Sequence, residues 1–307
     1  MGLTGALIER RDLVAFADEV GGSDAVAVEG SRTRWTAGGE PHAGVRLVRA
    51  PSGVSAYLPE EMVVCVGAGT TVAELTSVLA ASGQRSALPE RGGTVGGAIA
   101  VGEQHLDVLG RGSLRASVLE VRYASAEGRL VRGGGPTVKN VTGYDLPRLV
   151  TGSLGTLGLI AEVILRTNPV PTTSTWWRAE EADPFEVFQV LLRPSSVWWD
   201  GNVTWVHLEG HAGDVAAQAR ALTRFASFTE VDGRPSLPPH RWSLEPSALR
   251  ELQGRFVASI GVGLVFRDEP QPQRSPDATS LVVAARVKRE FDPNGRLNPG
   301  RDPARRP

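Results

Sequence analysis

The order of apolar and polar residues predicts alternating short helices and strands in the first part of the chain. Apolar positions recur with helical spacing over residues 6–20, and a short strand is expected at 25–28. A continuous apolar run at 63–67 predicts a buried strand. The helix expected at 72–81 starts at a Thr-x-x-Glu sequence, residues 71–74, which is the spacing of a capping box. This part of the chain therefore forms a strand, turn and helix unit.

Further strands are expected between the glycine-rich parts of the chain. Residues 118–124 and 129–132 have the pattern of two strands joined by a turn at Glu127 and Gly128. Residues 160–166 form another largely apolar stretch, and Asn168-Pro169 ends it.

The composition changes after Pro169, and we place a domain boundary there. Five of the seven tryptophans lie between 176 and 205, glycine clusters become rare, and residues 214–228 have helical spacing. The tryptophan pairs at 176–177 and 198–199 fit a domain core or a partner surface. We therefore expect two domains, residues 1–168 and residues 169–307.

Two glycine-rich stretches interrupt the pattern of the first domain. Residues 88–102 hold too many glycines for a stable strand and too few polar residues for a solvated linker, and they include Gly-Gly-Thr-Val-Gly-Gly at 92–97. Such a hexad can turn several backbone N–H groups toward a pyrophosphate, or it can form a tight structural loop. Residues 152–158 repeat the pattern, and there both ligand contact and close helix packing are open. With Gly112-Ser113 and the polar segment 139–145, these clusters indicate one long ligand.

Other kinds of site find little support in the sequence. Gly67-Ala68-Gly69 follows a strand and precedes a helix, but Val72 stands where the dinucleotide motif G-x-G-x-x-G needs its last glycine. No G-x-x-x-x-G-K-[ST] phosphate loop occurs. His207 and His211 are four residues apart, but residues 203–208 alternate like a strand, which would separate them. We therefore expect no metal site.

Charge and composition narrow the class of protein further. The formal net charge of −1 over 307 residues lacks the basic character of nucleic-acid binders. No apolar run approaches the roughly 20 residues of a membrane-spanning helix, and the first residues lack a signal-peptide core, so we expect a cytoplasmic protein. The single cysteine, Cys65, lies in the apolar run at 63–67 and is expected to be a buried hydrophobe.

Four motifs, in their order and spacing, resemble the PCMH-type FAD-binding domain of the vanillyl-alcohol oxidase superfamily. They are Gly-Gly-Thr-Val-Gly-Gly at 92–97, Arg-Gly-Ser-Leu-Arg at 111–115, Thr-Val-Lys-Asn-Val-Thr-Gly-Tyr-Asp at 137–145 and Gly-Ser-Leu-Gly-Thr-Leu-Gly-Leu-Ile at 152–160. The ending Phe-Asp-Pro-Asn-Gly-Arg-Leu-Asn-Pro-Gly is similar to the terminal signature of the glycolate oxidase and D-lactate dehydrogenase branch. Lys-Asn-Val-Thr-Gly-Tyr-Asp at 139–145, Gly-Ser-Leu-Gly at 152–155 and Leu-Glu-Gly at 208–210 resemble segments of the smaller, accessory flavin subunit of glycolate oxidase.

This resemblance implies a fold, a cofactor and a set of site residues. The fold is α+β, with an FAD-binding domain of two α+β subdomains followed by a smaller α+β cap domain, and the terminal segment 291–300 returns to the FAD-binding domain. The cofactor is FAD. The cofactor-binding residues come from six parts of the chain: Gly30, Ser31, Arg32, Thr33, Arg34, Arg91, Gly92, Gly93, Thr94, Val95, Gly96, Gly97, Gly112, Ser113, Lys139, Asn140, Gly143, Gly155, Thr156, Gly158, Ile160 and Asn298.

The first phosphate-binding loop departs from the family's usual run of glycines. It reads Glu-Gly-Ser-Arg-Thr-Arg at 29–34, so fewer bare N–H groups remain, and Arg32 and Arg34 offer charge in their place. This loop contains no His or Cys, and His42 and Cys65 match no linkage position that we recognise. We therefore expect FAD to be held without a covalent bond.

The chemistry implied is the oxidation of a small 2-hydroxy acid. It needs hydride acceptance by the flavin, a base for the hydroxyl proton and a cation for the carboxylate. The sequence offers cations but no recognisable base, so no catalytic residue is assigned. We expect a flavin subunit that works with a larger flavin subunit and an iron-sulfur subunit in a glycolate oxidase-like complex. An independent FAD-dependent dehydrogenase and a scaffold that has lost its flavin are the alternatives.

Overall fold

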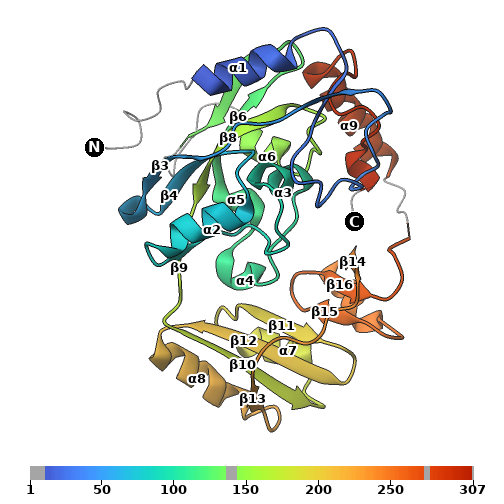
Figure 1. Ribbon diagram of the computed structural model, residues 1–307. Coiled ribbons are helices and arrows are strands. Elements are labelled where there is room, and N and C mark those ends of the chain that lie inside the picture. Colours follow the sequence, from blue (N-terminus) through green and yellow to red (C-terminus); the bar gives the residue numbers. More distant parts are fainter. Residues whose placement is uncertain (1–10, 136–143, 273–276, 306–307) are drawn as a thin grey trace. The chain divides into compact units, whose positions relative to one another are not determined.

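The computed structural model describes residues 11–135, 144–272 and 277–305, which form two compact units, each with its own core (Figure 1). Within these residues, the second unit consists of 106–112 and 170–272, and the first unit consists of the rest. The first unit therefore includes a C-terminal segment that follows the second unit in sequence. Both units combine helices with antiparallel sheet.

A five-stranded antiparallel sheet forms the centre of the first unit. Its order is β3-β4-β8-β6-β7, with β3 (Val54–Leu58), β4 (Val63–Gly67), β6 (Val118–Ala124), β7 (Leu130–Gly134) and β8 (Leu159–Arg166). Every residue of β4 is buried, because apolar clusters cover both faces of this strand. The apolar runs that predicted β4 and β8 reflect this position in the middle of the sheet.

Short helices cover one face of this sheet. The helices are α2 (Val72–Ala80), α3 (Val95–Val101), α5 (Leu114–Ser117) and α6 (Leu146–Val150), and their apolar side chains join those of β4, β6 and β8 in one cluster. Thr71 and Glu74 form the predicted capping box at the start of α2. The sequence did not indicate α3, because its glycines have poor helix propensity and its stability comes from packing.

The opposite face of the sheet buries charged groups. Arg122 lies 3.1 Å from a Glu120 oxygen and 3.2 Å from a Glu162 oxygen, and the hydroxyl of Ser55 donates to Glu162 at 2.7 Å. Cys65 is buried beside this network, and burial raises the pKa of its thiol to about 12. The thiol is therefore protonated at neutral pH, as a small hydrophobic residue would require.

A smaller layer combines the two ends of the first unit. Helix α1 (Arg11–Val20) packs beside a parallel strand pair, β1 (Val26–Val28) and β2 (Arg46–Val48), and Leu297 from the C-terminal segment forms a parallel bridge to Val26. A separate antiparallel pair joins β5 (Gln84–Arg85) to β9 (Asn168–Pro169). Strand β9 is the last strand of the first unit before the chain continues into the second unit at residue 170.

The C-terminal helix α9 (Ala278–Phe291) was not foreseen from the sequence. It follows a polar, Pro-rich stretch, and Phe291 at its end packs against the sheet's core. The Lys288 ammonium donates to the carbonyl of Thr156 at 2.7 Å. In the described ranges, no helix combines the length and apolar character needed to cross a membrane.

A seven-stranded antiparallel sheet forms the second unit, in the order β13-β10-β12-β11-β15-β16-β14 (Figure 1). The strands are β10 (Thr173–Glu180), β11 (Ser196–Trp199), β12 (Val203–Gly210), β13 (Thr229–Val231), β14 (His240–Ser243), β15 (Val257–Ser259) and β16 (Leu264–Arg267). Helices α7 (Pro184–Val190) and α8 (Ala212–Leu222) contribute to its larger apolar cluster, and α4 (Val108–Arg111) belongs to the excursion 106–112. Short 3-10 helices at Pro59–Glu61, Pro246–Glu251 and Pro303–Arg305 complete the described elements.

The clustered tryptophans pack in the apolar clusters of the second unit. Trp198 is fully buried in a second, smaller apolar cluster that includes Trp176 and Trp205. Trp177 and Trp199 pack with the larger cluster. The sequence left two roles open for these tryptophan pairs, a domain core and a partner surface. Within the second unit, their side chains pack in the apolar clusters of the core.

Leu75 offers a test of the first unit's core. Its side chain is 0% exposed on α2, so Leu75→Ala should lower the unfolding free energy of the first unit by about 2–5 kcal/mol. Val78→Ala is the matched control on the same helix, because Val78 is 38% exposed, and its effect should stay within about 0.5 kcal/mol. Denaturant unfolding measures both; equal losses in the two variants would contradict the assigned core.

Candidate functional site

A cavity of about 750 Å³, counting space open to solvent, lies within the first unit. Its wall is formed by residues 28–35, by residues around α3, by the turn at 154–155 and by the C-terminal segment. Eleven of the residues expected to bind the cofactor line it: Gly30, Ser31, Arg32, Thr33, Arg34, Thr94, Gly96, Gly97, Gly155, Ile160 and Asn298.

The backbone around this cavity is strained in a way that is typical of functional sites. Arg32, Leu154 and Asn298 all line it, and their φ angles are +57°, +54° and +46°. Residues other than glycine seldom adopt this left-handed conformation, and they do so where surrounding contacts hold them. Asn298 shows such contacts, because its amide group donates to the carbonyl of Leu154 at 2.7 Å and accepts from the N–H of Val28 at 3.1 Å.

The two arginines of the first loop lie in different environments. The side chain of Arg32 is 55% exposed, bonds to Glu29 at 2.6 Å and stacks 4.7 Å from the ring centre of Trp35. The side chain of Arg34 is only 4% exposed, and its Nε lies 2.5 Å from Glu103. Both residues line the cavity, but only Arg34 is part of its buried interior.

The guanidinium of Arg34 connects the first loop to the glycine hexad. One terminal nitrogen, Nη1, donates to the carbonyl of Gly92 at 2.7 Å and to the hydroxyl of Thr33 at 3.2 Å. The other, Nη2, is buried and has no hydrogen-bond partner among the described residues.

The glycine hexad uses much of its hydrogen-bonding capacity within the protein. The N–H of Val95 donates to Thr70, that of Gly96 donates to Ala68, and that of Gly97 donates to the hydroxyl of Thr94. A Cβ added at Gly96 would lie 2.7 Å from that of Ala68, so this glycine allows close backbone packing. The structural-loop interpretation therefore accounts for these three N–H groups, while Thr94, Gly96 and Gly97 line the cavity.

Eight of the expected cofactor residues do not line the cavity. One is Gly158, where a side chain would meet the ring of Tyr123. Another is Thr156, whose hydroxyl donates to the carbonyl of Ser153 at 2.7 Å. The others are Arg91, Gly92, Gly93, Val95, Gly112 and Ser113. Three further residues, Lys139, Asn140 and Gly143, lie outside the described residues.

Residues 9–134 match the FAD binding domain family. The chain contains an FAD binding domain. The glycolate oxidase subunit GlcE of Escherichia coli (strain K12) is 34% identical over 195 residues, which cover 60% of this chain and 56% of that protein. A D-lactate dehydrogenase of Archaeoglobus fulgidus is 36% identical over 113 residues, which cover 36% of this chain and 25% of that protein. The chain thus spans between a quarter and just over half of these relatives.

Among solved structures, alkyldihydroxyacetonephosphate synthase superposes with a TM-score of 0.67 at 13% sequence identity, covering 94% of this chain and 73% of that one. At this identity the likeness shows the fold alone. The comparisons confirm three expectations from the motifs: the FAD-binding domain, the α+β fold and FAD as the cofactor.

Some residues that line the cavity of the FAD binding domain were missed by sequence reasoning. Ala68 and Gly69 belong to the turn that was considered and set aside as a nicotinamide motif. Trp35 and Arg301 have no such motif, and they meet because the C-terminal segment folds back: the Arg301 guanidinium lies 5.1 Å from the ring centre of Trp35. Because these two residues are more than 260 positions apart, no local sequence pattern indicates that they meet.

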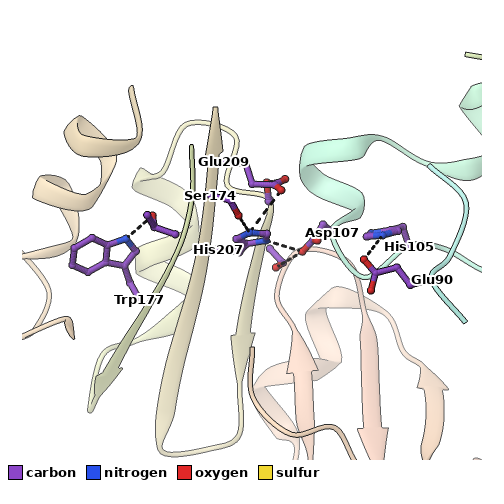
Figure 2. A network of polar contacts seen from close by, with 10 residues as sticks. Glu90, His105, Asp107, Ser174, Trp177, His207 and Glu209 are labelled. Carbon is purple, nitrogen blue, oxygen red and sulfur yellow. Dashed lines mark hydrogen bonds and ion pairs between the residues drawn. The ribbon is translucent and has the colours of Figure 1, made fainter. Parts of the chain in front are cut away.

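A second polar cluster lies within the second unit, around His207 on β12 (Figure 2). Its Nδ1 is 3.0 Å from a carboxylate oxygen of Asp107, and its Nε2 is 2.9 Å from the hydroxyl of Ser174 on β10. The ring is buried and stacks on Trp176 at 4.2 Å, while Glu209 lies 3.8 Å from Nε2. Because the Asp107 carboxylate can only accept, Nδ1 of neutral His207 carries the proton, and Nε2 accepts from Ser174.

From the sequence, His207 was weighed as a metal ligand and as an ordinary polar position at a strand end, and the second role was favoured. The expected strand is present, and His211 lies beyond its end, at the residue before α8. The part of the chain that the structure describes contains no group of three metal-ligating side chains. Asp107 could not be associated with His207 in advance, because the two are separated by 100 residues.

Gly97 provides the cleaner test of the cavity as the FAD site. A Cβ there would meet only the Thr94 hydroxyl, at 3.0 Å, so Gly97→Val should fold and yet fill the cavity, reducing flavin retention to a small fraction of the wild-type value. Gly96→Val should instead destabilise the domain, because its Cβ would lie 2.7 Å from that of Ala68.

Flavin absorbance after gel filtration gives the occupancy, and the unfolding midpoint of the apoprotein reports on the fold. Gly213→Val on α8 is the matched control, because nothing lies within 4 Å of a Cβ at that exposed position. Full occupancy in a folded Gly97→Val variant would show that FAD does not use this cavity.

Proposed function

We propose that this chain is the flavin-binding subunit of a cytoplasmic, glycolate oxidase-like complex that oxidises a small 2-hydroxy acid. The observation that carries the proposal is the cavity within the FAD binding domain, together with the 34% identity to the glycolate oxidase subunit GlcE. The proposed partners are a larger flavin subunit and an iron-sulfur subunit. Their identity is implied by the family resemblance, and the cytoplasmic location is a separate expectation from the sequence.

The residues around the cavity suit a flavin dinucleotide. Apolar side chains, including Leu154, Leu159 and Ile160, form part of the wall, while the loop 30–34 and Thr94 supply polar groups. A small-molecule site of this kind combines an apolar surface with a few polar groups that fix orientation. We propose that Gly30, Ser31, Thr33, Thr94, Gly97, Gly155 and Asn298 hold FAD. When bound, FAD supplies the acceptor for the hydride of the substrate.

Independent catalysis is the alternative that the sequence left open. It would need a base for the hydroxyl proton. His207 is buried in the second unit, and both of its ring nitrogens are paired, one with Asp107 and the other with the hydroxyl of Ser174. We therefore assign no catalytic residue.

The flavin should be bound without a covalent bond. In the residues that line the cavity there is no His or Cys, and Cys65 is buried in β4 as a protonated thiol. The purified protein should be yellow, and acid precipitation should leave the flavin in the supernatant. Flavin in the pellet would contradict this, and a colourless protein that does not take up added FAD would favour the scaffold that has lost its flavin.

The isolated chain should oxidise glycolate and lactate poorly. Steady-state dye reduction, with and without a larger flavin subunit and an iron-sulfur subunit, separates the two candidate functions. Turnover that appears only with the partners supports the subunit. Turnover of about 1 per second or more by the chain alone would support independent catalysis.

A further inference from the structure

We propose that Arg34 is the main cationic ligand of the FAD pyrophosphate and replaces the glycine N–H donors that the first loop lacks, whereas Arg32 takes no part. This inference rests on the proposed binding of FAD in the cavity. It goes further because it selects one of the two arginines in this loop. It also assigns to that arginine the preference of the site for ligands that contain phosphate over ligands that lack it.

The first argument is the buried, unpaired donor. The Arg34 side chain is 4% exposed and lines the cavity, and its Nη2 has no hydrogen-bond partner among the described residues. An arginine nitrogen without a partner in a buried place is unfavourable, because the water that it has lost is not replaced. A phosphate oxygen at the cavity would supply the missing acceptor, and guanidinium groups suit phosphates in charge and in geometry.

The second argument is that the guanidinium is already positioned. Glu103 binds Nε at 2.5 Å, and the carbonyl of Gly92 binds Nη1 at 2.7 Å, so the plane of the group is fixed from two sides. Arg91 lies 3.9 Å from the same Glu103, which leaves two positive charges against one negative charge. A donor held in place before binding loses little conformational entropy when an anion arrives.

The third argument concerns the alternative donors. The glycine hexad cannot use the N–H groups of Val95, Gly96 and Gly97 for an anion without breaking existing hydrogen bonds, since all three donate within the protein. Arg32 is less suited, because 55% of its side chain is exposed and its guanidinium lies over Trp35, where it bonds to Glu29, which Arg49 also binds. Arg34 therefore remains as the buried cation of this loop.

The experiment compares the apoprotein of the wild type with Arg34→Met, Arg34→Lys and Arg32→Met. Flavin fluorescence gives the Kd of FAD, and displacement of FAD gives those of ADP and adenosine, which differ in the diphosphate. Arg34→Met should weaken FAD and ADP by about 10- to 100-fold, as expected for a charged hydrogen bond, and leave adenosine within about 2-fold. Arg34→Lys should keep part of the affinity, because it retains charge without the fork. Arg32→Met should stay near the wild type.

Three outcomes would overturn the inference: unchanged FAD and ADP binding in Arg34→Met, equal weakening of ADP and adenosine, or an Arg32→Met defect as large as that of Arg34→Met. If Arg34→Met does not fold, as judged by circular dichroism and the unfolding midpoint, the ratio of ADP to adenosine affinity in Arg34→Lys decides. A wild-type protein that binds no FAD refutes the proposed function itself. Wild-type binding with unaffected Arg34 variants refutes only the role of Arg34.

Discussion

The docking of the C-terminal segment on the first unit is the interaction on which the cavity depends. Arg296 is buried and donates to three backbone carbonyls from distant parts of the chain, those of Val20, Asp24 and Ala126. Asn298 then connects the carbonyl of Leu154 to the N–H of Val28. Each of these carbonyls would otherwise lose a hydrogen bond on burial, so the segment satisfies the backbone of the elements that it joins. The loop at 28–35 and the turn at 154–155 are thereby held on either side of one cavity.

The glycines of this protein serve two different purposes. Gly96 and Gly158 let backbone or aromatic groups approach closely, and any side chain there would meet Ala68 or Tyr123. Gly97 is different, because it leaves space at the cavity wall. A glycine-rich motif in the sequence therefore mixes positions needed for packing with positions needed for the ligand. In this domain, side chains such as Arg34 and Asn298 supply polar groups that a glycine loop would otherwise provide from its backbone.

The second unit adds a polar centre to an otherwise apolar sheet face. His207, Asp107 and Ser174 form a hydrogen-bonded chain (Figure 2). The ring of His207 also stacks on that of Trp176. Buried polar networks cost free energy unless every member is paired, and this one pairs both ring nitrogens of the histidine. The excursion 106–112 is held to this unit partly through Asp107, which also accepts from the hydroxyl of Ser196 at 2.9 Å. The same contacts that anchor this segment also fix the imidazole in one tautomer.

The sequence by itself determined the strand β4, the capped helix α2, the hairpin of β6 and β7 and the order of the flavin motifs, because each depends on the periodicity and identity of neighbouring residues. The family resemblance also pointed to the loop 30–34 and to Asn298, which line the cavity. The sequence could not find α3 or α9, whose helical conformation depends on packing rather than on strong local propensity. It could not separate Gly97 from Gly158, or Arg34 from Arg32, because nothing local tells which side chain is buried. The pairing of His207 with Asp107 and of Trp35 with Arg301 was likewise decided only by the tertiary structure, since residues 100 or more positions apart meet through the folding of the whole chain.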